Sequence, residues 1–128
     1  MLITLDLEND VPIYGQLRNA VIDGIARGAL KPGDALPSVR RLAEDLGINL
    51  HTVNKAYSIL RAEGFVAVHK QKGVVVKNAA EAGLEPAARE ALKEKLRIVA
   101  AELTCRGVSQ DDFLQLCVEA FDAIHKGA

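Results

Sequence analysis

The sequence predicts a mainly α-helical chain with one small β-hairpin, in which a helical domain is followed by an α-helical hairpin. Three observations carry this prediction. Apolar residues recur at helical spacing through most of the 128 residues. Alternating β-branched residues occur together only between Val66 and Val76. Glycine or proline stands where the helical patterns stop. At this length the chain is one small domain, or a domain with an appendage.

Three helical patterns open the chain. The first begins at Pro12, stops near Gly28 and carries on one side Ile13, Leu17, Ala20, Val21 and Ile25. The second follows Ser38, a typical capping residue, and ends at Gly47, as expected where a helix closes in a left-handed conformation. Its apolar face holds Val39, Leu42, Ala43 and Leu46. The third follows Asn49, ends before Gly64 and repeats that spacing with Val53, Ala56, Tyr57 and Leu60. The last two short helices are therefore expected to share one core.

The third helix leaves a polar face rich in hydrogen-bond donors and without like-charge crowding. This face holds His51, Thr52, Asn54, Lys55, Ser58 and Arg61. The major groove of DNA admits one helix, and the leading residues of a recognition helix reach the base edges. We therefore expect residues 49–55 to lie nearest the bases. The alternative is the solvated face of an ordinary helix.

A hairpin with a basic tip follows. Residues 66–69 and 74–76 are predicted to be strands, joined by a turn of Lys70, Gln71, Lys72 and Gly73. Lysines tolerate the loose geometry of phosphate contacts, although charged tips also protect edge strands from pairing with other chains. Helices followed by a basic hairpin predict a winged helix-turn-helix domain.

Charge is distributed unevenly along the chain. Residues 36–80 carry seven basic and three acidic side chains, whereas residues 1–35 carry three and five, and residues 81–128 carry six and nine. The total of −1 therefore hides a central segment of +4. Because phosphate binding responds to the local field, the near-neutral total does not argue against DNA binding.

Other classes of function find no support in the sequence. It has no glycine-rich phosphate loop and no nucleophile with a neighbouring base, so we expect neither an enzyme nor a cofactor. His51, His69 and His125 lack metal-ligand spacing, which argues against a metal site. Cys105 and Cys117 lack CxxC spacing and are expected to fill small apolar positions. Without a signal peptide or an apolar span, we expect a cytoplasmic protein with reduced thiols and no membrane partner.

Several motifs together carry a family resemblance. The segments VPIYGQL, PGDALPSVRRLAEDLG, NLHTVNKAY and EGFV resemble the DNA-binding domain of the GntR family of bacterial transcriptional regulators, over about Val11 to Lys77. The resemblance implies a sequence-specific DNA-binding regulator in which Arg40 and the wing tip contact DNA, with Arg41 as a weaker candidate. The DNA-binding residues expected on all these grounds are Ser38, Arg40, Arg41, Asn49, Leu50, His51, Thr52, Asn54, Lys55, Lys70, Gln71, Lys72 and Gly73.

Leu50 departs from the family pattern. Related sequences often have arginine or proline directly after the capping asparagine, and an arginine there could bind a guanine. Leucine offers only apolar contact, either with a thymine methyl group or with its own protein, and both interpretations stay open from the sequence. His51 or Asn54 would then read the bases.

The chain beyond the hairpin is predicted to be a dimerisation tail. We expect a DNA-binding domain at residues 1–77, a linker at 78–85 and two helices within 86–128. Pro86 opens the first helix, Gly107 ends it, and Ser109 with Asp112 resembles a capping pair for the second. The two apolar stripes comprise Leu92, Leu96, Val99, Leu103, Phe113, Leu116, Cys117, Ala120, Phe121 and Ile124. Two helices cannot bury both stripes alone, so they dock either on their own domain or, as we expect, on a second copy.

A short two-helix tail resembles the YtrA subfamily, whose members are dimeric and often encoded beside transporter genes. We therefore expect a homodimeric repressor that binds a palindromic double-stranded operator. Such a tail has little volume for a large effector pocket, while a small effector at the dimer interface stays open. The rival interpretation is a winged-helix module that binds proteins and does not recognise a DNA sequence.

Overall fold

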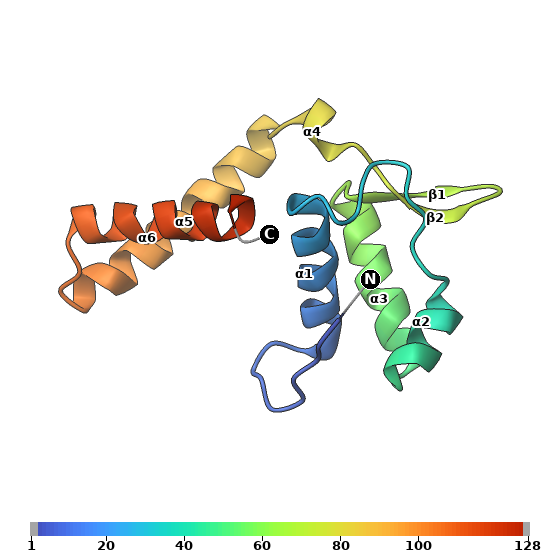
Figure 1. Ribbon diagram of the computed structural model, residues 1–128. Coiled ribbons are helices and arrows are strands. Elements are labelled where there is room, and N and C mark those ends of the chain that lie inside the picture. The colour runs from blue at the N-terminus through green and yellow to red at the C-terminus, as the bar shows by residue number, and fades with distance from the viewer. Residues whose placement is uncertain (1–2, 127–128) are drawn as a thin grey trace. The chain divides into compact units, whose positions relative to one another are not determined.

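Helices form most of the described chain, and within it one hairpin supplies the two strands (Figure 1). The computed structural model describes residues 3–126. In chain order the elements are α1 (Ile13–Ala26), α2 (Val39–Leu46), α3 (Leu50–Ala62), β1 (Val66–His69), β2 (Gly73–Val76), α4 (Ala79–Ala82), α5 (Pro86–Cys105) and α6 (Gln110–His125). The predicted mainly α fold with a small hairpin is confirmed. The chain divides after Ala79 into two units.

The first unit is built around α3. Helices α1 and α2 both pack against it, and α1 lies alongside it in Figure 1. The core consists of Leu17, Val21, Leu36, Leu42, Ala43, Val53, Ala56, Tyr57, Leu60, Val66 and Val76. All four apolar residues predicted for α3 are buried, whereas in α2 only Leu42 and Ala43 are buried and Val39 is half-buried.

Side-chain caps set the turn between α2 and α3. The Ser38 hydroxyl accepts a hydrogen bond from the Arg41 backbone N–H at 3.1 Å, and the Asn49 amide oxygen accepts one from the His51 N–H at 2.7 Å. Gly47 closes α2 in the left-handed region, with φ of 66°. These three predicted helix boundaries are confirmed. They start α3 at Leu50, only three residues after α2 closes.

Gln16 of the VPIYGQL motif and Arg18, just after the motif, fasten α1 to its surroundings. The Gln16 amide donates to the backbone oxygens of Asp6 and Val11 and accepts from the Asp6 N–H, each at 2.8 Å. Arg18 forms a two-pronged ion pair with Glu63, with nitrogen–oxygen distances of 2.9 and 3.0 Å. Because Glu63 lies at the end of α3, this pair ties the middle of α1 to the helix that it covers.

The hairpin is an antiparallel pair with Val66 opposite Val76 and His69 opposite Gly73. The sequence had placed Gly73 in the turn, but it opens β2, and the turn comprises residues 70–72. A further bridge joins Ala35 to Val75, and the Leu36 N–H donates to the Val74 oxygen at 2.8 Å. The segment before α2 is therefore attached to the hairpin, an arrangement that the sequence did not predict.

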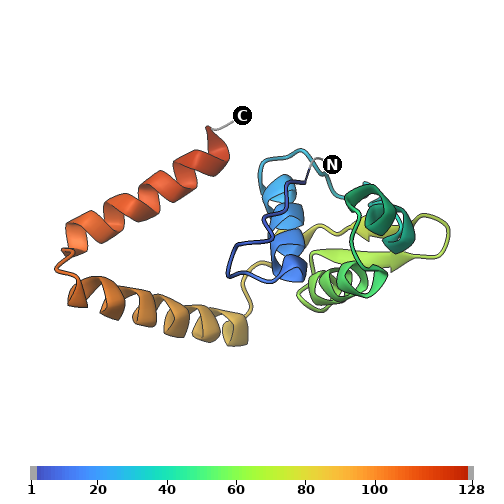
Figure 2. The same cartoon turned by 90° about the horizontal axis from the view of Figure 1, so that it is seen from below.

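The second unit contains α5 and α6, which diverge from the turn that joins them (Figure 2). Its residues begin with most of α4, which forms a short helix inside the predicted linker. Ser109 caps α6 by accepting a hydrogen bond from the Asp112 N–H at 3.1 Å, as predicted. Near the joining turn, Leu103, Val108 and Phe113 are half-buried.

Helices α5 and α6 do not bury each other's apolar stripes, as the sequence predicts for two helices alone. Neither helix has a buried residue, and Leu96, Leu116 and Phe121 are about half or more exposed, at 46, 50 and 66%. Cys105 is exposed, so the prediction that it fills an apolar position is wrong for the single chain. Cys117 is also exposed and belongs to the stripe predicted to pair with a second copy. No helix among the described residues is long and apolar enough to cross a membrane.

Candidate nucleic-acid interface

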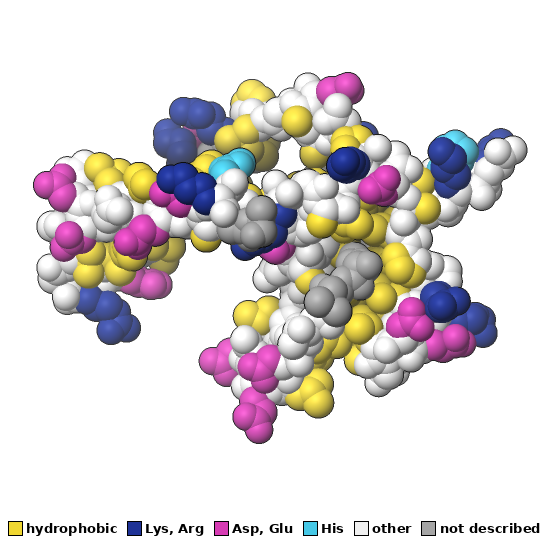
Figure 3. All heavy atoms as spheres, in the orientation of Figure 1, with side chains coloured by type: hydrophobic (Ala, Val, Ile, Leu, Met, Phe, Trp, Pro, Cys, Tyr) yellow, Lys and Arg dark blue, Asp and Glu magenta, His cyan; other side chains and the backbone are white. Residues whose placement is uncertain are grey.

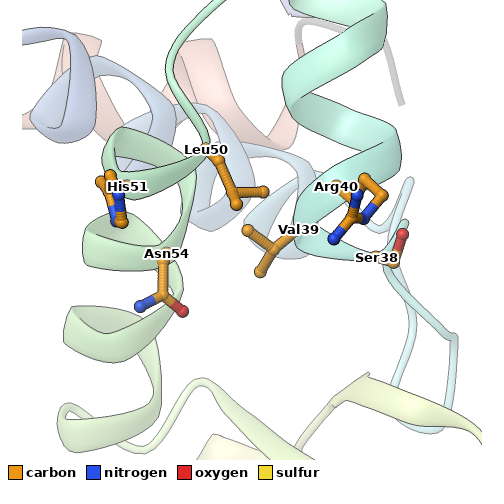
Figure 4. A pocket seen from close by; sticks show the side chains of 6 residues that line it. All are labelled: Ser38, Val39, Arg40, Leu50, His51 and Asn54. Carbon is orange, nitrogen blue, oxygen red and sulfur yellow. The ribbon is translucent and has the colours of Figure 1, made fainter.

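An open groove lies between the start of α2 and the start of α3 (Figure 4). We call it the α2/α3 groove; its volume is about 440 Å³ and its lining is Ser38, Val39, Arg40, Leu50, His51 and Asn54. Five of these six residues were predicted to contact DNA, and they come from two separate sequence segments. Val39 was assigned to the core, but its exposed edge completes the groove. The helix-turn-helix therefore brings the predicted residues of both segments together.

The buried Tyr57 fixes one wall of the groove. Its hydroxyl donates to the Pro37 carbonyl at 2.8 Å, which anchors the chain just before Ser38 onto α3. Burial raises the pKa of the Tyr57 hydroxyl to about 12, because the ionised form would be deprived of water. With Leu36 bonded to β2, the chain entering α2 is thus held by α3 on one side and by the hairpin on the other.

A second, smaller hollow continues toward the hairpin. Val39 and Asn54 line it as well, and its other walls are formed by Tyr57, Ser58, Arg61, Val66, Val68 and Val74. The shared residues make one concave surface from the start of α2 to the hairpin strands. Arg61, on the last turn of α3, adds a positive charge at the hairpin end of this surface.

The positive side chains around this surface differ in their partners. Within residues 3–126, Arg40, Lys70 and Lys72 have no acidic partner, so their charges are available to phosphates. Arg41 instead pairs with Asp45 one turn along α2, at 3.2 Å. Lys55 places its ammonium 4.1 Å from the centre of the Tyr14 ring, a cation–π contact with α1.

The wing consists of β1, β2 and the turn between them, and basic side chains with a histidine gather at its free end (Figure 3). The His69 Nδ1 atom accepts hydrogen bonds from the Gln71 and Lys72 N–H groups, both at 3.2 Å. Gly73, which opens β2, has a φ of 76°, a left-handed conformation that glycine adopts without strain. His69 thus shapes the turn, a role that the sequence had not led us to expect. Its place two residues before the turn amides was the available signal, because short polar side chains bond the backbone in this way.

Leu50 is the one large apolar residue predicted to contact DNA. It is 40% exposed and belongs neither to the hydrophobic core nor to the residues packed against it. Leu50 therefore lies at the surface of the first unit, outside its core. Thr52, two residues later, is half-buried, and Asn49 uses its side-chain oxygen for the helix cap.

The fold and the groove define a winged helix-turn-helix DNA-binding protein. The family described as bacterial regulatory proteins, gntR family, matches residues 13–76. The chain is also 33% identical over 107 residues to the HTH-type transcriptional repressor YtrA of Bacillus subtilis, a match that covers 84% of this chain and 82% of the relative. This chain belongs to the GntR family and is a DNA-binding transcriptional regulator of the YtrA-like kind.

Two solved structures extend the similarity beyond the helix-turn-helix. A transcriptional antiterminator from Listeria monocytogenes has a TM-score of 0.90 at 26% identity and covers 97% of this chain and 92% of its own. YtrA from Sulfolobus acidocaldarius, a GntR-family transcription factor, has a TM-score of 0.57 at 39% identity and covers 92% of this chain and 95% of its own. Both matches therefore include most of the second unit.

Proposed function

We propose that this regulator acts in the cytoplasm as a homodimeric repressor that binds a palindromic operator, with no catalytic role. One observation carries the proposal. The α2/α3 groove presents Arg40, His51 and Asn54 beside a wing whose two lysines have no acidic partner among the described residues. The repressor named among its relatives supports the direction of regulation.

Bases and phosphates are assigned to different residues of this surface. The start of α3 enters the major groove, where His51 and Asn54 offer polar groups to base edges. Arg40 and the wing contact phosphates, with Lys70 and Lys72 supplying charge and with Gln71 and Gly73 supplying backbone groups. The remaining predicted residues lie on α2 and α3 or cap them, and they are assigned to flanking backbone contacts: Ser38, Arg41, Asn49, Thr52 and Lys55. The Ser38 hydroxyl can donate to a phosphate while it accepts the capping bond.

The second unit supports the dimer. Along α5 and α6 the predicted stripes stay exposed, with Leu92 at 42%, Val99 at 42% and Phe121 at 66%. Exposed apolar surface of this extent is typical of an interface between protein chains. Pairing through a two-fold axis would let two recognition helices bind two half-sites, and the second contact then gains from a high effective concentration.

Salt-dependent binding tests the DNA assignment. Fluorescence anisotropy of a labelled duplex from upstream of the gene would give the dissociation constant at several salt concentrations. Replacing Lys70 and Lys72 by alanine should lower the magnitude of the salt slope by about one for each phosphate that is no longer neutralised. The matched control replaces Lys31 and Lys77, which flank the other end of the hairpin, and should leave the slope close to wild type. An unchanged slope for the Lys70 and Lys72 variant would contradict the wing's role.

Sedimentation of the full chain tests the dimer. We expect a dimer at micromolar concentration, and we expect Phe121→Asp to produce monomers because it places a charge on the exposed stripe of α6. Gln115→Asp puts the same charge on the polar side of the same helix and should leave the dimer intact. A wild-type monomer under these conditions would refute the assignment.

A reporter gene behind the upstream DNA should lose expression when the wild-type chain is supplied, and increased expression would argue for activation.

A further inference from the structure

We infer that the floor of the α2/α3 groove, formed by Val39 and Leu50, is a subsite for the 5-methyl group of a thymine in each operator half-site. The inference rests on the proposed DNA binding and deepens it, because it names a base that the groove selects. Leu50 is the position at which this sequence departs from the family pattern, and here it would recognise a different base.

The two apolar side chains belong to one surface although they are eleven positions apart in the sequence. In Figure 4 the Val39 and Leu50 side chains point toward one another across the groove, one from the first turn of α2 and the other from the first turn of α3. Val39 is half-buried against the core, which fixes its position, while Leu50 is 40% exposed and lies outside the core. The chain therefore holds an apolar floor on the surface that faces DNA.

Polar groups surround this floor. Arg40 and Ser38 lie on the α2 side, and His51 and Asn54 lie on the α3 side. None of the six lining residues is acidic, so nothing in the groove repels a phosphate backbone. A groove with an apolar floor and a polar, positively charged rim matches the edge of a base pair that presents a methyl group beside hydrogen-bonding atoms.

Only one base offers such a group. In the major groove of unmodified DNA, thymine alone presents an apolar substituent, and the adenine paired with it presents N6 and N7, which suit an asparagine amide. Asn54 lies one turn after Leu50 on the same face of α3, so it is placed to bond an adenine close to the thymine that contacts Leu50. An arginine at position 50 would favour guanine instead. Leu50 is therefore a specificity-determining residue.

Uracil in place of thymine isolates the methyl group. The full chain would first select its preferred half-site from a randomised duplex library, and each thymine of that site would then be replaced singly by deoxyuridine, which keeps the base pair. At one thymine in each half-site we expect wild-type affinity to fall about fourfold, the effect of one buried methyl group. Leu50→Ala should bind the thymine duplex more weakly than wild type does. For this variant, replacing that thymine by uracil should cause no further loss of affinity.

Two controls keep the result specific. Leu7→Ala removes the same atoms from a leucine that is 81% exposed and does not line the groove, so it should behave as wild type. Replacing the selected thymine by cytosine should weaken binding, and 5-methylcytosine at that position should restore part of the affinity. The subsite is refuted if no thymine is sensitive to uracil, or if Leu50→Ala retains the full sensitivity. Tight, sequence-selective binding without uracil sensitivity would leave the proposed function standing, whereas equal affinity for all duplexes would overturn both.

Discussion

Replacing Tyr57 by phenylalanine should both destabilise the chain and change how its stability depends on pH. The hydroxyl is the donor of a 2.8 Å bond to the Pro37 carbonyl, and the residue is only 4% exposed. Removing the donor leaves a carbonyl without its partner at a part-buried place, which typically costs about 1–3 kcal/mol. Because a newly exposed carbonyl edge can still reach water, we expect the lower end, about 1 kcal/mol at pH 7.

The dependence of stability on pH above pH 10 gives a sharper test of this burial. Burial raises the pKa of the Tyr57 hydroxyl from 10.0 to about 12 in the folded chain. Above pH 10 the unfolded state therefore binds fewer protons than the folded state, so stability falls as pH rises. One pKa unit corresponds to about 1.4 kcal/mol, so the wild type loses about that much through this residue by pH 11. The phenylalanine variant lacks this loss, and the two stability curves should meet near pH 11.

Urea unfolding followed by circular dichroism would measure both effects. Melts of wild type and Tyr57→Phe at one chain concentration, from pH 7 to pH 11.5, give the difference in unfolding free energy at each pH. That difference cancels the titration of all other groups. Tyr14→Phe is the matched control, because this tyrosine is only half-buried. A difference that stays constant up to pH 11.5 would refute the argument from burial.

Three further outcomes are expected. His69→Ala should weaken DNA binding about two- to tenfold because two turn amides lose their acceptor, while stability stays unchanged. His69→Asn should restore binding, and equal losses from the two variants would contradict this role. Gly47→Ala should cost about 1–2 kcal/mol in urea unfolding because its φ is 66°, and a neutral result would remove the strain argument. A double-mutant cycle on Arg18 and Glu63 should give under about 1 kcal/mol, since both side chains are about one-third exposed; zero coupling would mean that the pair only accompanies helix packing.

Local signals in the sequence predicted much of the fold. The spacing of Val53, Ala56, Tyr57 and Leu60 identified the buried face of α3, and Ser38 marked the start of α2. These succeed because helical periodicity and capping depend on neighbours within one turn. The exposed face of α3, which we propose meets DNA, followed by elimination as the residues that the core does not use.

Contacts between distant segments could not be predicted in this way. The bridge from Ala35 to Val75 pairs a proline- and glycine-rich loop with a strand forty residues away, and too few residues take part to leave an alternating pattern. Lys55 was assigned to DNA from its helical position, but its ammonium also contacts the Tyr14 ring on α1. Val39 was placed in the core by periodicity, and only the packing of α2 against α3 makes it line the groove as well.

The two units differ in how much of their own apolar surface they bury. We expect this difference to determine how operator affinity depends on the concentration of the regulator. The first unit encloses a core with seven residues at 2% exposure or less, plus an anchored tyrosine, so its groove is preformed in a single chain. The second unit buries none of its residues in α5 or α6. Pairing would therefore add stability mainly to the tail, while leaving each recognition surface unchanged. Operator affinity should then follow the dimerisation equilibrium, because a half-site contact alone lacks the effective concentration that the second contact provides.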